Sequence, residues 1–200
     1  MRAWICRKCL LRFEKKLPGW FRRVELQILM NATARAFGVP GKRIRSLHWE
    51  KALREYAEFT AACTNAYIEE RKSVLPPSVP PSDEESKSDV LPAAERIYQT
   101  AYRLGAAVRR ITGFREPADL RLLVFRLYAG IGIYLRGKLP GSFVVTDCFF
   151  SHFYSPEQCA LMSAMDAGII AGIFGGGRLE FSGRITEGCS HCSACFRIKR

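Results

Sequence analysis

Residues 155–177 read SPEQCALMSAMDAGIIAGIFGGG, and no other stretch of the chain has so clear a beginning and end. Ser155 stands before Pro156, and Gln158 follows three positions after the serine. This order is typical of a capping box with proline in the first helical position. Apolar and small residues follow until three glycines interrupt the run at Gly175. The stretch therefore predicts a helix from residue 156 to about residue 174.

Strand patterns lie on both sides of this helix. Residues 141–150 read GSFVVTDCFF, a β-branched and aromatic run that predicts a strand ending near Cys148. Residues 178–186 read RLEFSGRIT and alternate in polarity as a half-buried strand does. We expect a last short strand over residues 193–198.

Helical spacing of apolar residues dominates the chain before these strands. It predicts helices over residues 20–37, 48–70 and 94–111, and a further helix from residue 117 to about residue 135. Because helices come first and strands come late, we expect an α+β fold. It would have N-terminal helices and a small C-terminal antiparallel sheet packed with helices.

A compositional break divides the chain. Residues 73–92 read SVLPPSVPPSDEESKSDVLP, with five prolines, five serines and an acidic cluster, which is typical of an extended linker. The sequence thus predicts a basic arm and helical region over residues 1–72, a linker over residues 73–92, and a cysteine-rich α+β domain over residues 93–200. It leaves open whether the two flanking regions share one core.

The net charge of +12 concerns the choice of partner. Fourteen of the 31 Lys and Arg residues precede Glu55, against only Glu14, Glu25 and Glu50 among the acids. A field of this sign attracts anions, which include nucleic acid, anionic lipid and acidic metabolites. No RNP-type aromatic motif, helical basic region or zinc-finger spacing accompanies the charge. The sequence therefore argues against a nucleic-acid partner and favours a solvated basic face.

Three features concern the compartment. The first residues, MRAWICRKCLLRF, are basic but lack an apolar run of signal-peptide length. The longest apolar stretch, residues 120–135, is interrupted by Arg121 and Arg126 and is too short to span a bilayer. Eight cysteines without an export signal are typical of thiols, metal ligands or catalytic groups. We expect a soluble cytoplasmic protein whose oligomeric state the sequence does not give.

Cys159 and Asp166 are candidate catalytic residues on the capped helix. Seven residues separate them, so both project from one face, about 10 Å apart along the axis. Cys159 lies in the first turn, where the helix dipole favours a thiolate. Asp166 has small and apolar neighbours, so it needs a partner or has a raised pKa. The alternative is that Cys159 packs as a small apolar side chain and Asp166 faces solvent.

The C-terminal cysteines form a candidate metal site with the spacing Cys-x-x-Cys-x-x-Cys. The ligands would be Cys189, His191, Cys192 and Cys195, and the ion zinc or an Fe–S cluster. A further ligand could come from Cys148, Cys159 or the Cys6/Cys9 pair of the basic arm. If the segment is a strand, however, Cys192 points away from Cys189 and Cys195, and the three sulfurs do not converge.

His152 is a further candidate, because it follows the Cys148 strand in a loop before the capped helix, where functional side chains are often held. The alternative is an ordinary hydrogen-bonded loop residue.

The order of these residues resembles the L-2-amino-thiazoline-4-carboxylic acid hydrolase family. The resemblance rests on a strand ending in Cys148, on Cys159 with Asp166 seven residues later, and on Glu187-Gly188-x3-Cys192 before an aromatic strand. It covers roughly residues 95–198. The extra Cys189 and Cys195 and the CRKC arm depart from the family pattern. The terminal pattern is also similar, more weakly, to 4-vinyl-reductase-type ligand-binding domains.

The hydrolase resemblance implies hydrolytic opening of a cyclic amidine ring with no required cofactor. Cys159 would be a nucleophile or a thiol that shapes the site, and Asp166 a general base or the partner of the amidinium. Cys148 and Cys192 would line the pocket, and Arg178 or Arg184 would hold the carboxylate of a small anionic substrate. The second resemblance implies instead a non-enzymatic module that binds a small molecule or a metal. A third reading keeps the family outline as scaffold only, with the basic arm docking a partner.

Overall fold

The computed structural model describes residues 17–74 and 91–199. The basic arm with Cys6 and Cys9 and most of the predicted linker lie outside the described residues. The helices are α2 (Gly19–Phe37), α3 (Trp49–Val74), α5 (Leu91–Thr112), α6 (Pro117–Gly130) and α7 (Pro156–Phe174). The strands are β1 (Ile133–Gly137), β2 (Gly141–Cys148), β3 (Arg178–Gly183) and β4 (Cys192–Arg197), with short 3-10 helices η1 (Phe149–His152) and η2 (Ile185–Glu187). The predicted α+β class is confirmed.

One predicted element is wrong in its last residues. The helix expected from residue 117 to about 135 ends at Gly130, and Ile133–Gly137 form strand β1. Gly132 has a φ of +77°, in the left-handed region that interrupts a helix. The residues after it pair with β2, so that Leu135 lies opposite Val145. The apolar run of residues 120–135 hid this boundary, because a buried helix and a buried strand are both apolar.

The four strands form one antiparallel sheet in the order β1-β2-β4-β3. Strand β4 therefore lies between β2 and β3 although it follows both in the chain. Along β4 the side chains of Cys192, Ala194 and Phe196 are buried, and those between them face the other side of the sheet. This alternation gives the sheet one face toward the helices and one face outward.

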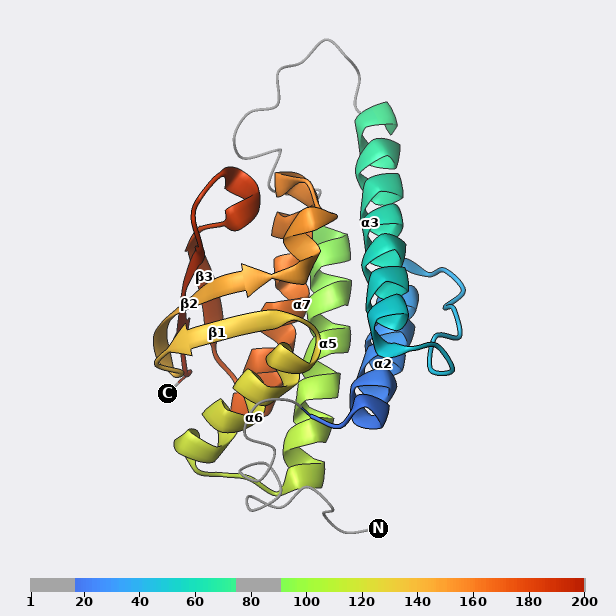
Figure 1. Ribbon diagram of the computed structural model, residues 1–200. Coiled ribbons are helices and arrows are strands. Elements are labelled where there is room, and N and C mark those ends of the chain that lie inside the picture. Colours follow the sequence, from blue (N-terminus) through green and yellow to red (C-terminus); the bar gives the residue numbers. More distant parts are fainter. Residues whose placement is uncertain (1–16, 75–90, 200) are drawn as a thin grey trace.

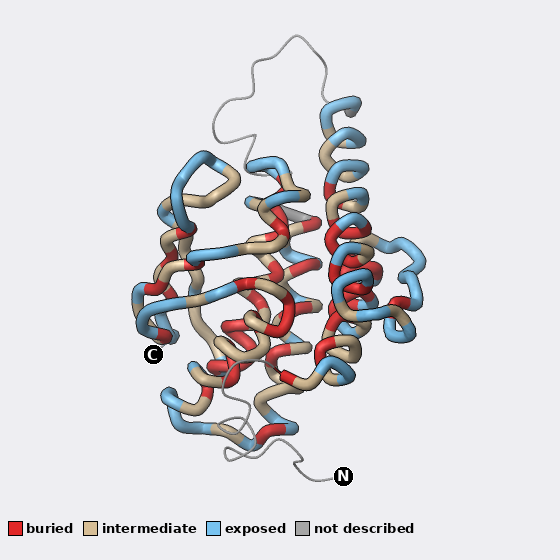
Figure 2. The backbone as a smooth tube through the Cα atoms, viewed as in Figure 1, coloured by how far each residue is buried: buried red, intermediate tan, exposed pale blue. Residues whose placement is uncertain are grey.

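The helices form layers beside the sheet (Figure 1). Helices α5 and α7 run side by side through the middle, with the sheet on one side and α2 and α3 on the other. Buried residues concentrate where these layers face one another (Figure 2). Helix α7 is apolar nearly all round because it is covered by other elements on several sides.

The hydrophobic core contains residues from both sides of the predicted linker. Leu26 of α2, Leu53 of α3, Ile170 of α7 and Phe196 of β4 belong to one buried cluster. The two flanking regions therefore share one core, a point that the sequence left open.

The start of α7 has the predicted capping box. The Ser155 hydroxyl accepts a hydrogen bond from the Gln158 backbone N–H at 3.2 Å, and the Gln158 side-chain oxygen accepts one from the Ser155 N–H at 2.7 Å. The amide nitrogen of Gln158 donates to the Ala61 carbonyl at 3.0 Å, which connects this end of α7 to α3. The helix ends at Gly175, whose φ is +85°. These contacts fix the rotation of the helix that carries Cys159 and Asp166.

Of the helices in the described part of the chain, none has the length and apolar character needed to cross a bilayer.

Candidate functional site

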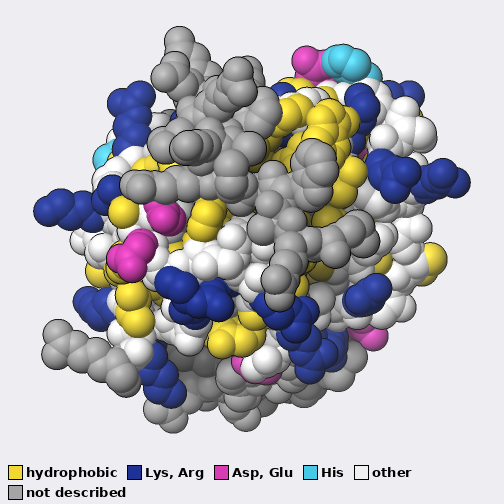
Figure 3. Space-filling view, turned by 90° about the horizontal axis from the view of Figure 1, so that it is seen from below, with side chains coloured by type: hydrophobic (Ala, Val, Ile, Leu, Met, Phe, Trp, Pro, Cys, Tyr) yellow, Lys and Arg dark blue, Asp and Glu magenta, His cyan; other side chains and the backbone are white. Residues whose placement is uncertain are grey.

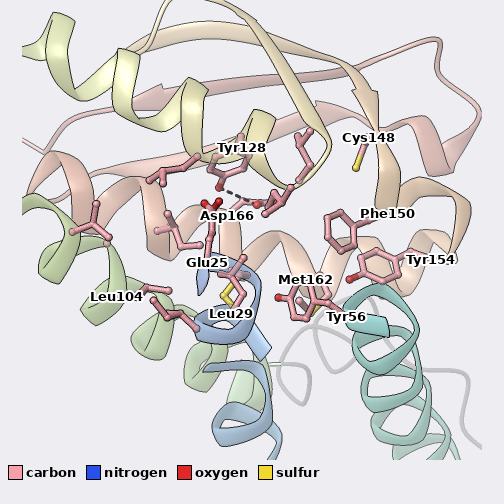
Figure 4. A pocket seen from close by; sticks show the side chains of 18 of the residues that line it. Glu25, Leu29, Tyr56, Leu104, Tyr128, Cys148, Phe150, Tyr154, Met162 and Asp166 are labelled. Carbon is pink, nitrogen blue, oxygen red and sulfur yellow. Dashed lines mark hydrogen bonds between the residues drawn. The ribbon is translucent and has the colours of Figure 1, made fainter. Parts of the chain in front are cut away.

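A cavity of about 200 Å³ lies among the helices and the adjoining end of the sheet. Its wall is almost entirely aliphatic and aromatic, with contributions from α2, α3, α5, α6 and α7 and from the segment between β2 and α7. A few polar groups interrupt this wall: two carboxyl groups, two thiols, three tyrosine hydroxyls and the Ser151 hydroxyl. Figure 4 shows Glu25, Tyr128 and Asp166 in one part of the pocket and Tyr56, Phe150 and Tyr154 in another.

Asp166 of α7 projects into the cavity, where its carboxylate accepts a hydrogen bond from the Tyr128 hydroxyl at 3.0 Å (Figure 4). Burial raises the pKa of Asp166 to about 6, although the Tyr128 hydrogen bond and the charge of Arg184 act in the opposite direction. Burial likewise raises the pKa of Tyr128 well above its usual value, so the phenol stays a donor. The sequence predicted either a partner or a raised pKa for Asp166, and the structure places Tyr128 as its hydrogen-bond partner while burial raises its pKa.

Glu25 of α2 lies in the same part of the cavity. Burial raises the pKa of its carboxyl well above the usual range, and the charge of Arg22 opposes this only in part. Its Oε2 atom is buried and has no hydrogen-bond partner among the described residues. This atom lies against Gly130 at the end of α6. A Cβ at that position would come within 2.7 Å of it, so the glycine leaves room for the carboxyl group.

Aromatic side chains form much of the wall, and hydrogen bonds hold their polar ends. The Tyr56 hydroxyl is 3.2 Å from the Thr33 hydroxyl, and the Tyr154 hydroxyl bonds with that of Thr60. Phe150 lies between the two tyrosines, with ring centroids 5.7 Å from Tyr56 and 5.8 Å from Tyr154. The cavity therefore has a wall that is largely formed before any ligand enters.

Three of the predicted cysteines lie at or beside the cavity. Cys148 and Cys159 line it, and Cys192 of β4 is close enough to Cys159 to affect its pKa. Burial raises the pKa of Cys148 to about 12 and also raises the pKa of Cys159 and Cys192. Burial of Cys159 therefore opposes the thiolate that its place in the first helical turn favours. The helix dipole favours a thiolate in the first turn, but removing the sulfur from water has the larger effect.

The two predicted arginines differ in position. The side chain of Arg184 is only 19 % exposed, donates to Glu187 at 2.9 Å and lowers the pKa of Asp166 and Cys159 through its charge. Arg178 is 82 % exposed and pairs with Glu180 at 3.1 Å, away from the cavity. The structure thus brings Arg184 next to the pocket and leaves Arg178 outside it.

His152 does not line the cavity either. It borders a separate surface depression with Trp49 and Asp147. Of the five predicted catalytic residues, the structure therefore brings together Cys148, Cys159 and Asp166, places Cys192 beside them and leaves His152 apart.

The candidate metal ligands are not brought together. Cys189 and His191 are exposed in the turn before β4, Cys192 is buried, and Cys195 lies on the other face of the strand. Within residues 17–74 and 91–199, no group of three or more His, Cys, Asp or Glu side chains is placed to hold a metal ion. Cys192 and Cys195 lie in strand β4 and point to opposite faces, so their sulfurs do not converge. The Cys6/Cys9 pair lies outside the described residues.

The basic side chains lie outside the cavity wall, most of them on the surface. No Lys, Arg or His side chain is among the described residues that line the pocket. Figure 3 shows Lys and Arg side chains distributed around the end of the molecule at α6 and the neighbouring ends of α5 and α2. The pocket wall thus lacks the basic side chain expected for an anionic substrate.

Sequence reasoning missed Glu25 and Tyr128. A signal for Glu25 was present, because it stands four residues after Phe21 and three before Ile28, on the apolar face of the predicted helix. An acid on such a face is a candidate for a buried site. Tyr128 lies in an apolar run with nothing local to distinguish it.

Comparisons with protein-family models, with curated proteins and with solved structures find no match. The feature that bears on function is the pocket, an apolar cavity with two buried carboxyl groups and thiols whose pKa burial raises.

Proposed function

We propose that this protein binds a small, largely apolar molecule in the cavity and acts as a non-enzymatic binding module. The observation that supports this most directly is the cavity itself, whose wall is aliphatic and aromatic except for a few polar groups. An apolar cavity of about 150 Å³ is large enough to bind benzene. At about 200 Å³, this cavity has room for a ligand of one substituted ring.

Apolar burial is the main driving force for such a ligand. A ring-sized molecule that loses roughly 200 Å² of apolar surface to the pocket gains about 5 kcal/mol. The hydrogen bonds that hold Tyr56, Tyr128 and Tyr154 limit the reordering of the wall that binding requires. A preformed wall leaves more of this free energy for affinity.

The thiols favour binding over covalent catalysis. A cysteine nucleophile reacts as the thiolate, and burial raises the pKa of Cys148, Cys159 and Cys192. On this proposal the cysteines contribute small apolar surface to the wall and its surroundings.

A pocket-blocking variant tests the binding proposal. Ile28 lines the cavity and is 44 % exposed, so Ile28→Trp can enlarge the side chain at the margin without overfilling the core. Val39→Trp is the control, because Val39 is 38 % exposed and does not line the cavity. We expect indole to raise the melting temperature of the wild type and of Val39→Trp, but not of Ile28→Trp. An equal shift in all three proteins would contradict binding in this cavity.

Hydrolysis of a cyclic amidine is a second candidate, and Asp166 is the observation that favours it. A carboxyl group with a pKa of about 6 inside an apolar pocket can act as a general base near neutral pH. Asp166 would take a proton from water as the water oxygen adds to the ring carbon between nitrogen and sulfur. The carbon–sulfur bond would then break as the carbonyl forms. The proton held by Asp166 would pass to the leaving sulfur, and the second proton of the water would pass to the ring nitrogen. Arg184 is the basic side chain whose charge lowers the pKa of Asp166, and on this proposal it would hold the substrate carboxylate.

Release of a thiol from 2-aminothiazoline-4-carboxylate tests this candidate. We expect the wild type to release thiol, Asp166→Asn to lose the activity, and Asp147→Asn, an exposed acid on β2, to keep it. The hydrolase proposal fails if purified wild-type protein releases no thiol, and Asp166 has no role in it if Asp166→Asn stays active.

A further inference from the structure

We propose that the ligand of this cavity is an organic cation, an apolar body ending in an ammonium group that lies between Glu25 and Asp166. The inference rests on the proposed function, because it requires the cavity to be a ligand site. It adds the chemical class of the ligand, which the apolar wall alone does not give.

The first observation is the unpartnered oxygen of Glu25. Buried polar atoms nearly always have a hydrogen-bond partner, so a buried carboxyl oxygen without one needs an explanation. Glu25 lines the cavity from α2, and its Oε2 has no partner among the described residues. A ligand N–H group that enters the cavity would supply the missing donor.

The second observation is that Asp166 lines the same cavity as Glu25 but comes from a different helix (Figure 4). Charges on Asp166 and on Glu25 both raise the pKa of the Tyr128 hydroxyl, so both carboxyl groups are within electrostatic reach of one atom. Tyr128 donates one hydrogen bond to Asp166 and neutralises neither acid. An ammonium group has three donors and a positive charge, which suits a site with two carboxyl groups.

The third observation is the negative end of α6 beside Glu25. The Oε2 atom of Glu25 lies against Gly130, the last residue of α6, where the helix dipole favours positive charge. The neighbouring Arg22 is directed elsewhere: its Nε donates to the Gly130 carbonyl at 3.0 Å and its guanidinium lies 3.2 Å from the centre of the Trp49 ring. No described basic side chain lines the cavity, so a bound cation would add a positive charge inside it beside those that Arg22 and Arg184 supply from outside.

The groups around Glu25 also determine how protons respond to binding. Arg22 on the same helix lowers the pKa of Glu25, whereas Tyr128 from α6, Tyr56 from α3 and Asp166 from α7 carry no positive charge. Helix α5 presents only apolar residues to the cavity. In the absence of a cation, burial favours the protonated form of the Glu25 carboxyl. A bound ammonium group stabilises its carboxylate, so we expect binding to release a proton.

Three probes of matched shape and different charge test the inference. They are 2-phenylethylamine, 2-phenylethanol and 3-phenylpropionate, titrated into the full chain by calorimetry at pH 7.5. We expect the amine to bind at least about tenfold more tightly than the alcohol, because hydrogen bonds to charged groups exceed those to neutral ones by about this factor. The carboxylate should bind weakest of the three. Titration of the amine in two buffers of different ionisation enthalpy should show proton release.

Two substitutions assign the effect to the acids. Glu25→Gln and Asp166→Asn should each reduce the preference for the amine over the alcohol about tenfold. In Glu25→Gln the proton release should also disappear. Glu58→Gln, an exposed acid on α3, is the matched control and should behave as the wild type. The comparison of the three probes on the wild type tests the inference without any variant, so it remains decisive even if a variant folds poorly.

The outcomes separate the two proposals. If the alcohol binds as tightly as the amine, or more tightly, the cavity is a ligand site but the cation inference is overturned. If none of the three probes binds, the proposed function fails, and the inference that rests on it fails too.

Discussion

At the scale of single residues, the buried carboxyl groups of Asp166 and Glu25 lower the stability of the ligand-free protein. Burial raises the pKa of both acids, and each unit of such a shift corresponds to about 1.4 kcal/mol. For Asp166, with a pKa raised from 3.8 to about 6, the cost at neutral pH is about 2–3 kcal/mol. Residues that weaken the fold in this way are typical of binding and catalytic sites.

The pH dependence of stability should show the Asp166 contribution. A raised folded-state pKa means that the stabilising contribution is present below pH 4 and is lost as the pH rises through about 6. Relative to Asp166→Asn, the wild type should therefore lose about 2–3 kcal/mol of unfolding free energy between pH 4 and pH 7. Urea unfolding at several pH values measures the difference. Parallel curves for the two proteins would show that Asp166 has an ordinary pKa.

The thiols should differ in reactivity according to burial. Cys189 is exposed, whereas burial raises the pKa of Cys148, Cys159 and Cys192. In the folded protein at pH 7.5, iodoacetamide should modify Cys189 well before these three, as measured by peptide mass spectrometry. In urea the difference should vanish. Early modification of Cys159 would instead support the nucleophile that the sequence predicted.

Part of the site could be predicted from sequence, because its geometry is local. Seven residues along one capped helix place Cys159 and Asp166 on the same face, and both line the cavity. The protonation state of Cys159 could not be predicted in this way, since it depends on burial by elements far away in the chain. Glu25 joins Asp166 only through the packing of α2 against the rest of the core, which no local pattern specifies.

At the scale of elements, the contact between α5 and α7 depends on glycines. A Cβ on Gly105 would overlap with the Ile169 carbonyl oxygen, one on Gly168 with that of Tyr98, and one on Gly172 with that of Tyr102. The two backbones therefore touch directly along several turns. This contact positions α7, and with it one side of the cavity, relative to α5.

Gly172→Ala should for this reason destabilise the protein although alanine is the better helix former. The added methyl group would separate α5 from α7, at a cost of about 3 kcal/mol. Gly19→Ala is the control, because a Cβ there meets nothing within 4 Å, and it should be neutral or stabilising by up to about 1 kcal/mol. Chemical unfolding of both variants decides the matter. Equal stability of the two would mean that the helices can move apart freely.

The elements that sequence predicted well are those with local signals of start and end. Helix α7 has its capping box and its terminal glycine, and β2 has a β-branched run. Strand β1 has neither, because it continues the apolar run of α6. Its identity as a strand comes from pairing with β2, which is a tertiary contact.

At the scale of the whole molecule, one core joins residues that the predicted linker separates. Leu26 and Leu53 before the linker pack in the same cluster as Ile170 and Phe196 after it. Neither region can keep its apolar surface buried without the other. Sequence could give the class of the fold, but the shared core and the strand order depend on contacts between distant segments.

Unfolding should therefore be a single cooperative transition. Trp20 and Trp49 report by fluorescence on α2 and α3, and circular dichroism at 222 nm reports on all helices. We expect the two signals to change at the same urea concentration. Two separate midpoints would support the division into independent regions that the composition of residues 73–92 suggested.

The strand order has a consequence for how the protein is made. A ribosome-bound chain that has emerged only as far as Gly183 carries β1, β2 and β3, yet the strand that joins β2 to β3 is still inside the exit tunnel. Until Arg197 has emerged, β2 has an open edge, and the helices lack the cover that Phe196 gives them. Such an edge attracts other strands, so the nascent protein is exposed to mispairing and to chaperones until β4 has left the tunnel.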